Sequence, residues 1–187
     1  GVQTLASLEV ASTNSSAKEN LKTLGHRSLV ITNHQTAGRG RGVHTWSDNA
    51  GQALLSSWIF KLDKSPQPIL SALIGLSLYE AAVRTWPAVP WTLKAPNDLH
   101  VVHKETHGDT ASKVAGILIE VVSTGNGSAA VVIGLGMNLT GSPSGTKPFL
   151  ATSVADELKR SGHSLTESDW GLFLKTWITL AEKRVTQ

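Results

Sequence analysis

The chain contains no cysteine among its 187 residues. Disulfide bridges and thiolate metal sites are therefore excluded as sources of stability or chemistry. No apolar run approaches the roughly 20 residues that a membrane-spanning helix requires, and the first residues lack the charged and then apolar pattern of a signal peptide. We expect a soluble protein that does not engage a membrane.

The chain also has little excess of positive over negative charge. The chain has 17 lysines and arginines against 14 aspartates and glutamates, a formal net charge of +3. This mild excess is compatible with an anionic nucleotide or an acidic protein partner, but it falls short of the clustered basic face of a DNA-binding protein. We therefore do not expect the chain to bind nucleic acid. Because 40% of the residues are hydrophobic, enough for a sizeable core, we expect residues 1–187 to form a single domain.

Hydrophobic periodicity predicts that helices and strands are interspersed along the chain. The predicted helices are 15–24, 69–86, 152–160 and 168–184, and the predicted strands are 28–32, 53–61, a short strand ending at Leu93, 99–102, 113–122 and 129–135. The polar segment 103–112 predicts a hairpin, and the segment 140–147, rich in glycine, serine and proline, indicates a flexible surface loop. These features favour an α+β fold: a mixed, mainly antiparallel sheet flanked by helices.

The segment from Gln35 to Trp46 places two arginines, Arg39 and Arg41, among three glycines. Glycine lets backbone N–H groups approach a ligand closely, and the arginine guanidinium is a planar fork of donors suited to carboxylate or phosphate. This combination favours an anion-binding loop. On its own, however, a Gly/Arg run is more often a solvated segment or one that touches nucleic acid.

Four further segments accompany this loop in a fixed order. They are Ser12-Thr13-Asn14 before it, and KAPNDL (94–99), KVAGILIE (113–120) and IGLGMN (133–138) after it. Together with the loop, and over roughly residues 5–140, they resemble the catalytic domain of biotin protein ligases. The resemblance implies the fold shared by biotin ligases, lipoate ligases and class II aminoacyl-tRNA synthetase cores.

The resemblance also implies an activity. A biotin–[biotin carboxyl carrier protein] ligase activates biotin with ATP as biotinyl-5′-adenylate, with Mg²⁺ as cofactor, and passes the acyl group to a lysine of a biotin carboxyl carrier protein domain. Carboxylate attack on the α-phosphate brings two anions together, so the site needs positive charge and N–H donors. ATP chemistry favours the cytoplasm, and the resemblance is compatible with a homodimer.

By the same resemblance, Lys113 and Arg41 are the expected catalytic residues. The expected biotin-binding residues, whose hydroxyl, amide and backbone groups suit a ureido ring or a carboxylate, are Ser12, Thr13, Asn14, Gln35, Gly38, Arg39, Gly40, Arg41, Lys113 and Gly116. The expected ATP- or adenylate-binding residues are Arg39, Arg41, Trp46, Lys94, Asn97, Lys113 and Asn138. Asp98 is a candidate magnesium ligand, because a hard cation takes oxygen ligands.

Several of these residues have simpler structural alternatives. The segment 12–14 can serve as a helix cap, Trp46 as a core residue, and Lys113 as a solvent-facing strand lysine. We expect Lys113 to lie just before an apolar strand, so that its side chain emerges at the end of the sheet. The loop 37–46 is expected to be mobile without ligand and to become ordered when biotin or its adenylate binds.

The chain departs from the family pattern in three places. Ala95 stands where tryptophan is usual, His44 stands where a further arginine is common, and the chain ends at Gln187 without the small β-barrel domain that usually follows. These departures concern the adenylation rate and ATP affinity more than biotin recognition. The helix-turn-helix of repressor-type members is also absent from the sequence, so transcriptional repression is not expected.

Two alternatives to a biotin ligase remain open. A lipoate or octanoate transferase of the same fold would not be expected to carry Gly-Arg-Gly-Arg before a tryptophan. A non-catalytic biotin- or adenylate-binding module is suggested by Ala95 and the missing domain. A zinc site at His100, His103 and His107 lacks acidic or thiol partners at fitting spacing, so we expect these histidines to lie on the surface.

Overall fold

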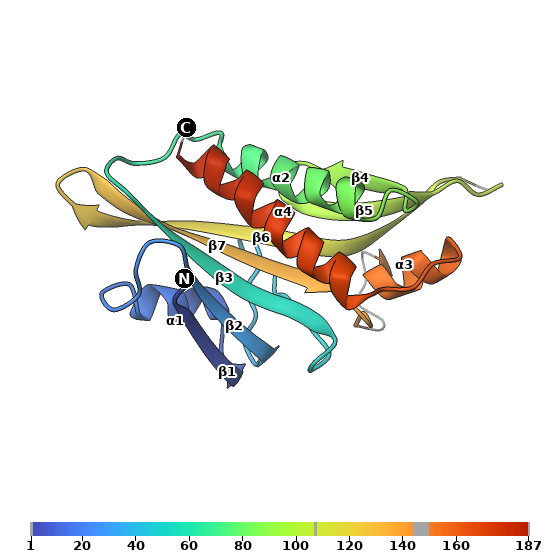
Figure 1. Cartoon of the computed structure of the whole chain (residues 1–187), viewed down its shortest axis with the longest axis horizontal. Coiled ribbons are helices and arrows are strands. Elements are labelled where there is room, and N and C mark those ends of the chain that lie inside the picture. The colour runs from blue at the N-terminus through green and yellow to red at the C-terminus, as the bar shows by residue number, and fades with distance from the viewer. Residues whose placement is uncertain (1, 107, 144–149, 187) are drawn as a thin grey trace. The chain divides into compact units, whose positions relative to one another are not determined.

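A computed structural model describes residues 2–106, 108–143 and 150–186. The chain divides into two compact units, one of Gly1–Pro68 with Ile117–Met137 and the other of Ile69–Gly116 with Asn138–Gln187. The elements, labelled in Figure 1 except for β8, are β1 (Thr4–Val10), α1 (Thr13–Glu19), β2 (Ser28–Gln35), β3 (Ala53–Leu62), α2 (Leu70–Thr85), β4 (Trp91–Lys94), β5 (Asp98–His103), β6 (Thr110–Gly125), β7 (Ser128–Asn138), β8 (Leu150–Ala151), α3 (Val154–Arg160) and α4 (Glu167–Val185).

The predicted α+β class, a mixed sheet flanked by helices, is confirmed. In the first unit the strand order is β1-β2-β3-β7-β6, with β1 parallel and β3 antiparallel to β2. In the second unit the order is β6-β5-β4, both pairs antiparallel, and β8 runs parallel to β6. Strand β6 contributes to both units, because the boundary falls between Gly116 and Ile117.

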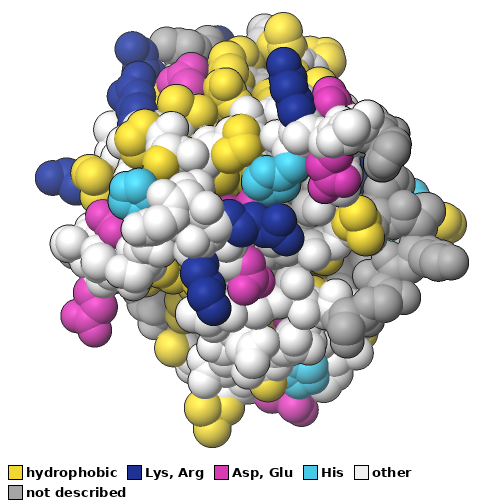
Figure 2. Space-filling view, turned by 90° about the vertical axis from the view of Figure 1, so that its right-hand side faces the viewer, with side chains coloured by type: hydrophobic (Ala, Val, Ile, Leu, Met, Phe, Trp, Pro, Cys, Tyr) yellow, Lys and Arg dark blue, Asp and Glu magenta, His cyan; other side chains and the backbone are white. Residues whose placement is uncertain are grey.

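The surface carries charges of both signs. On the face shown in Figure 2, basic, acidic and histidine side chains are interspersed. The described residues of this face form no large patch of a single charge. In the described ranges, no helix combines the length and the apolar composition needed to cross a membrane.

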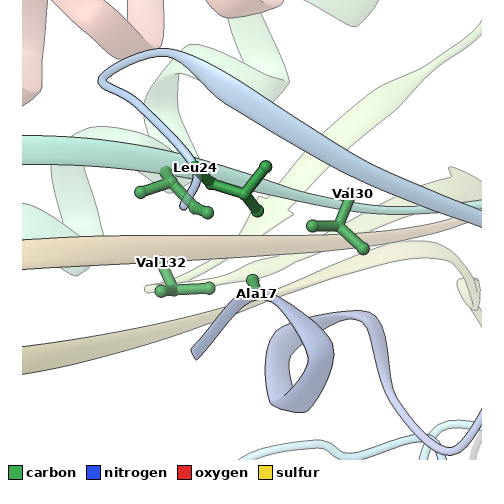
Figure 3. Packing of buried hydrophobic residues seen from close by; sticks show 5 residues of the cluster. Ala17, Leu24, Val30 and Val132 are labelled. Carbon is green, nitrogen blue, oxygen red and sulfur yellow. The ribbon is translucent and has the colours of Figure 1, made fainter. Parts of the chain in front are cut away.

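The core of the first unit is built where α1 covers strands β2 and β3. Ala17 of α1, Val30 of β2 and Ile59 of β3 are at most 1% exposed, and Leu24 and Val132 complete the cluster (Figure 3). The small side chain of Ala17 lets the helix approach the strands closely. Every second residue of β2 from Ser28 to Thr32 is buried, the alternation expected of a strand with one covered face.

The core of the second unit forms between α2 and α4, which lie side by side (Figure 1). Helix α4 buries one residue per turn, namely Phe173, Trp177, Ala181 and Val185. The Phe173 ring stacks on Trp86 with centroids 5.0 Å apart. Near the other end of α4, the Arg184 guanidinium donates to Glu80 Oε1 at 2.6 Å and to Ser77 Oγ at 2.9 Å. Aromatic stacking and a partly buried ion pair thus fix the two helices.

Several predicted boundaries are wrong. The strand β1 was not expected, because five of its seven residues are exposed and show no apolar face, as suits a strand at the edge of the sheet. Helix α1 starts two residues earlier than predicted and ends at Glu19, because Asn20 leaves the helical conformation and its side chain donates to Ser16 O. The predicted loop 140–147 lies partly outside the described residues, and the two-residue strand β8 follows it.

We predict that Ile59→Ala lowers the free energy of unfolding by about 2–5 kcal/mol, because it leaves a cavity in the fully buried cluster of the first unit. Leu8→Ala is the matched control: Leu8 is 81% exposed, so its truncation should change stability by no more than about 0.5 kcal/mol. Urea unfolding of both variants measures the difference. Equal losses in the two variants would show that the cluster does not stabilise the fold.

Candidate functional site

The segment Ser12-Thr13-Asn14 forms a buried polar corner at the start of α1. All three residues are at most 4% exposed. The Thr13 backbone N–H and hydroxyl both donate to Gln35 Oε1, at 2.8 and 3.2 Å. Ser12 occupies the N-cap position, but its side chain makes no capping hydrogen bond, so a plain helix cap does not account for the segment. The structure therefore brings together four of the predicted biotin-binding residues.

Ser57 belongs to the same corner and was not predicted from the sequence. It is fully buried in β3, and its Oγ lies 2.8 Å from Thr13 Oγ1 and 2.5 Å from Asn14 Oδ1. The signal for it in the sequence is the Ser56-Ser57 pair, which interrupts an otherwise apolar strand. Because buried hydroxyls need partners, Ser57 fixes the orientation of the Thr13 and Asn14 side chains.

The glycines of the IGLGMN motif make room for this corner and for Trp46. A Cβ atom at Gly134 would lie 2.3 Å from Asn14 Oδ1, and one at Gly136 would lie 2.5 Å from the Trp46 ring. Both distances are far below van der Waals contact, so only glycine allows Asn14 and Trp46 to lie against β7. This motif contributes space, not functional groups.

The Gly/Arg loop is folded as a small hairpin. The Trp46 N–H donates to Gly38 O at 3.0 Å, the Gly40 N–H donates to His44 O at 2.8 Å, and Arg39 forms a β-bridge with Thr45. Arg41 lies at the exposed tip, next to Gly42 with its positive φ of 60°. The predicted ordering of this loop by a ligand stays a prediction.

Glu120 joins the loop to the corner. Its carboxylate accepts hydrogen bonds from both terminal nitrogens of Arg39, from Lys18 Nζ at 2.7 Å and from Asn14 Nδ2 at 2.9 Å. Burial alone would raise the pKa of Glu120, but the hydrogen bonds from Lys18, Asn14 and Arg39 and the Arg39 charge outweigh it and hold the pKa below its ordinary value. Glu120 ends the KVAGILIE motif, and the sequence assigned it no role.

In the second unit, Lys113 is held by Asp98. Its Nζ donates to Asp98 Oδ1 at 2.8 Å, and its side chain is 27% exposed. Contrary to the prediction, Lys113 lies inside β6, which begins at Thr110, and does not precede the strand. The strand starts earlier because 110–113 pair with β5 across the hairpin.

A bulge and a glycine direct the Lys113 side chain. Leu99 pairs with Ala115 and His100 with Lys113, so Val114 has no partner in the β5–β6 ladder. Such a bulge changes the face toward which the neighbouring side chains point. The Lys113 ammonium lies above Gly116, where a Cβ atom would be 3.0 Å from Nζ. Gly116 therefore leaves the space in which the cation lies.

The other residues predicted to bind ATP or metal lie in the second unit. Lys94 is exposed at the end of β4, and Asn97 Nδ2 donates to Asp98 Oδ1 at 3.3 Å. Asn138 is buried, its Nδ2 donates to Thr152 O at 3.0 Å, and its Oδ1 has no hydrogen-bond partner among the described residues. An acceptor with this geometry suits an amino group of a ligand.

The described residues contain no group of three or more His, Cys, Asp or Glu side chains that could hold a metal ion. Asp98 already accepts from Lys113 and Asn97. Its carboxylate could therefore serve magnesium only together with water and phosphate oxygens, the usual manner of Mg²⁺ binding at nucleotide sites.

The prediction that the three histidines lie on the surface is wrong for His100, which is 4% exposed. Burial is the largest cause that lowers the pKa of His100 from its ordinary value, which favours the neutral ring. His103 is half-buried, and its Nε2 lies 2.6 Å from the Oε2 of the buried Glu157. His107 lies outside the described residues.

A titratable pair, His34 and Asp48, flanks the Gly/Arg loop in the first unit. His34 Nδ1 lies 2.8 Å from Asp48 Oδ2, and the Asp48 side chain is fully buried. The hydrogen bond to Asp48 is the largest cause that raises the pKa of His34 above 6.5, and the charges of Asp48 and Glu9 add to it against the opposing effect of burial.

The raised pKa means that the folded state binds the His34 proton more tightly than the unfolded state. We expect the stability from this pair to be complete below pH 6.5 and to be lost as the pH rises through the folded-state pKa. An NMR titration should give His34 a pKa above 6.5 in the parent and a lower one in Asp48→Asn. Identical titration curves for the two proteins would contradict the pairing.

Known proteins are similar to this chain in sequence. A biotin–[acetyl-CoA-carboxylase] ligase of Paracoccus denitrificans is 31% identical over 167 residues, which cover 85% of this chain and 64% of the relative. The ligase of the same name from Mycobacterium tuberculosis is 35% identical over 133 residues, covering 68% of this chain and 45% of the relative. The chain thus spans less than two thirds of the length of these relatives.

Solved structures share the fold. The biotin protein ligase of Leishmania major in complex with biotin superposes with a TM-score of 0.70 at 23% identity, covering 100% of this chain and 81% of that one. The R40G mutant of the Aquifex aeolicus enzyme gives a TM-score of 0.70 at 22% identity, covering 97% and 69%. The family model described as the biotin/lipoate A/B protein ligase family matches residues 6–138, and the chain belongs to this family.

Proposed function

We propose that the chain is an ATP-dependent biotin–protein ligase, which forms biotinyl-5′-adenylate and transfers the biotinyl group to a lysine of a biotin carboxyl carrier protein domain. The observation that carries this proposal is Lys113, a cation held by Asp98 over the space left by Gly116. Family membership and the relatives named as biotin–[acetyl-CoA-carboxylase] ligases support it. The use of ATP supports a cytoplasmic location.

Biotin recognition is assigned to the polar corner. A ureido ring offers one carbonyl acceptor and two N–H donors, and the corner offers hydroxyl and amide groups of both kinds. Thr13, Asn14 and Ser57 hold one another through short hydrogen bonds. Because these groups are oriented before a ligand arrives, little ordering of side chains opposes binding.

The first chemical step joins two anions. A biotin carboxylate oxygen attacks the α-phosphorus of ATP, a new P–O bond forms, and the bond to the β-phosphate oxygen breaks as pyrophosphate leaves with the electron pair. Lys113 and Arg41 stabilise the charge that develops on the phosphoryl and acyl oxygens. Asp98 is the residue that would help to hold magnesium carried by the triphosphate, and the ion would neutralise phosphate charge.

In the second step, the neutral ε-amine of the acceptor lysine attacks the acyl carbon. An amide bond forms, the bond between the acyl carbon and the phosphate oxygen breaks, and AMP leaves with the electron pair while the amine loses a proton to solvent. Lys94, Asn97 and Asn138 are the groups proposed to bind the nucleotide. Asn138 is placed among them because its buried Oδ1 can accept from an amino group.

The test of the proposal is transfer to a carrier domain, measured by mass spectrometry. With biotin, ATP and magnesium, the intact mass of a generic biotin carboxyl carrier domain should rise by one biotinyl group. Transfer of a lipoyl or octanoyl group in place of biotin would instead favour a transferase for linear acyl chains. Binding of biotin without retained adenylate and without transfer would indicate a non-catalytic module.

We predict that Lys113→Ala lowers the rate of pyrophosphate release by about a hundredfold or more, because an oriented cation beside developing charge contributes on the order of 3 kcal/mol. Lys104→Ala is the matched control, since Lys104 is an exposed lysine of the same β5–β6 hairpin. Both variants should unfold at the temperature of the parent. A near-normal rate for Lys113→Ala would contradict its assignment.

We further predict that Arg41→Gly weakens retention of the adenylate and spreads biotin to bystander proteins. The variant loses a guanidinium at the tip of the hairpin and gains backbone freedom, while Lys113 and the corner that make the adenylate remain. Gel filtration of the loaded protein measures retention, and mass spectrometry of a bystander such as albumin measures stray labelling. Tight retention with labelling of the carrier alone would show that Arg41 does not hold the intermediate.

A further inference from the structure

We propose that Glu120 is a positioning residue. It holds the Gly/Arg loop, residues 38–46, against the polar corner at the start of α1, and Arg39 is the loop residue that it contacts. The proposal rests on the proposed function for its consequence in biotin binding. It assigns a role to a residue that the predicted site did not include. It also gives the Arg39 side chain a partner within the protein, in place of substrate phosphate or carboxylate.

The geometry of the Arg39–Glu120 pair supports this role. Arg39 Nη1 donates to Glu120 Oε1 at 3.2 Å and Nη2 donates to Oε2, so two parallel hydrogen bonds join the guanidinium and the carboxylate. A paired contact of this kind fixes direction as well as distance. The β-bridge of Arg39 with Thr45 carries that constraint into the returning side of the hairpin.

The Glu120 carboxylate also contacts the polar corner. Asn14 Nδ2 donates to Glu120 Oε2 at 2.9 Å and to Leu118 O at 3.2 Å, while Asn14 Oδ1 lies 2.5 Å from Ser57 Oγ. Asn14 thus makes hydrogen bonds at both ends of its amide, so rotation of the amide would break its contacts with Glu120 and Ser57. A change at Glu120 therefore affects the loop and the corner together, which couples loop order to the orientation of the biotin-binding groups.

Charge balance favours a persistent contact. Lys18 Nζ lies 2.7 Å from Glu120 Oε1, so two cations, from α1 and from the loop, face one carboxylate. The Glu120 side chain is 21% exposed, and salt screens such a group less than a fully exposed one. Since its pKa is held below the ordinary value, the carboxylate stays charged across neutral pH, and the contact should persist from pH 6 to 8.

These contacts give the two arginines different roles. Arg39 is committed to Glu120 at the base of the hairpin, and Arg41 lies at its exposed tip. The loop would therefore be closed by one arginine and would hold the substrate anion with the other. Replacement of either arginine weakens ligand retention, but only replacement of Arg39 should alter the loop when no ligand is present.

Hydrogen exchange of the ligand-free protein, followed by mass spectrometry, tests the contact without any need for activity. Glu120→Gln keeps an amide oxygen that can accept from Asn14 but removes the charge that holds Arg39. We expect Glu120→Gln and Arg39→Gln each to speed exchange of residues 38–46 about three- to tenfold, and the double variant to add nothing further. Glu19→Gln, at an exposed carboxylate of α1, is the matched control and should leave exchange unchanged.

Biotin binding provides the second measurement. Glu120→Gln and Arg39→Gln should raise the KM for biotin and speed biotin dissociation, with the KM for ATP unchanged, and Arg39→Lys should restore part of the loss. Unchanged loop exchange in folded Glu120→Gln, or effects of the two single variants that add in the double variant, would overturn the proposal. If Glu120→Gln does not fold, Arg39→Gln decides alone, since Arg39 is 39% exposed. Absence of ligation by the parent protein would defeat the proposed function but would leave the exchange result intact.

Discussion

Acidic side chains hold two cations of the chain in place: Asp98 holds Lys113 in the second unit, and Glu120 holds Arg39 in the first. The Lys113–Asp98 pair answers the main physical difficulty of the proposed reaction, in which a carboxylate must approach a phosphate. A lysine or arginine free in solvent would lose side-chain entropy and reorganise its water when the substrate arrived. A cation already held by a carboxylate has met most of that cost during folding, so its charge is available in a fixed direction.

The candidate site residues also need space, and glycines, which have no side chain, provide it. Glycine at positions 116, 134 and 136 gives room to Lys113, Asn14 and Trp46 respectively. The unpaired Val114 breaks the regular alternation of β6 and so changes which way the neighbouring residues face. Motifs that look like short runs of glycine and aliphatic residues thus act by allowing other side chains to lie where they do.

Much of the fold could be predicted from the sequence. Long helices such as α2 and α4 bury residues at helical spacing, and a central strand such as β7 is an almost continuous apolar run, so these patterns identify them. The edge strand β1 has no such pattern, because its residues are largely exposed and its pairing partner is distant in the chain. The start of β6 was missed for a related reason, since its first residues are polar and are held by pairing with β5.

The candidate site could be predicted only in part. Ordered motifs identified Lys113, Arg39 and the corner residues. Ser57 and Glu120 were assigned no role, because their partners lie 43 and 106 positions away along the chain and nothing in the sequence identifies those partners. The Lys113–Asp98 pair was not predicted either, although both residues stand in recognised motifs, because a β-bulge determines their contact.

A crystal structure of the chain with biotinyl-5′-adenylate would test the central claim most directly. The account predicts that Lys113 Nζ lies within about 3 Å of a phosphate or acyl oxygen of the adenylate, while the Arg39 guanidinium remains paired with the Glu120 carboxylate. An adenylate that has no contact with Lys113, with Arg39 moved from Glu120 onto the phosphate, would contradict it.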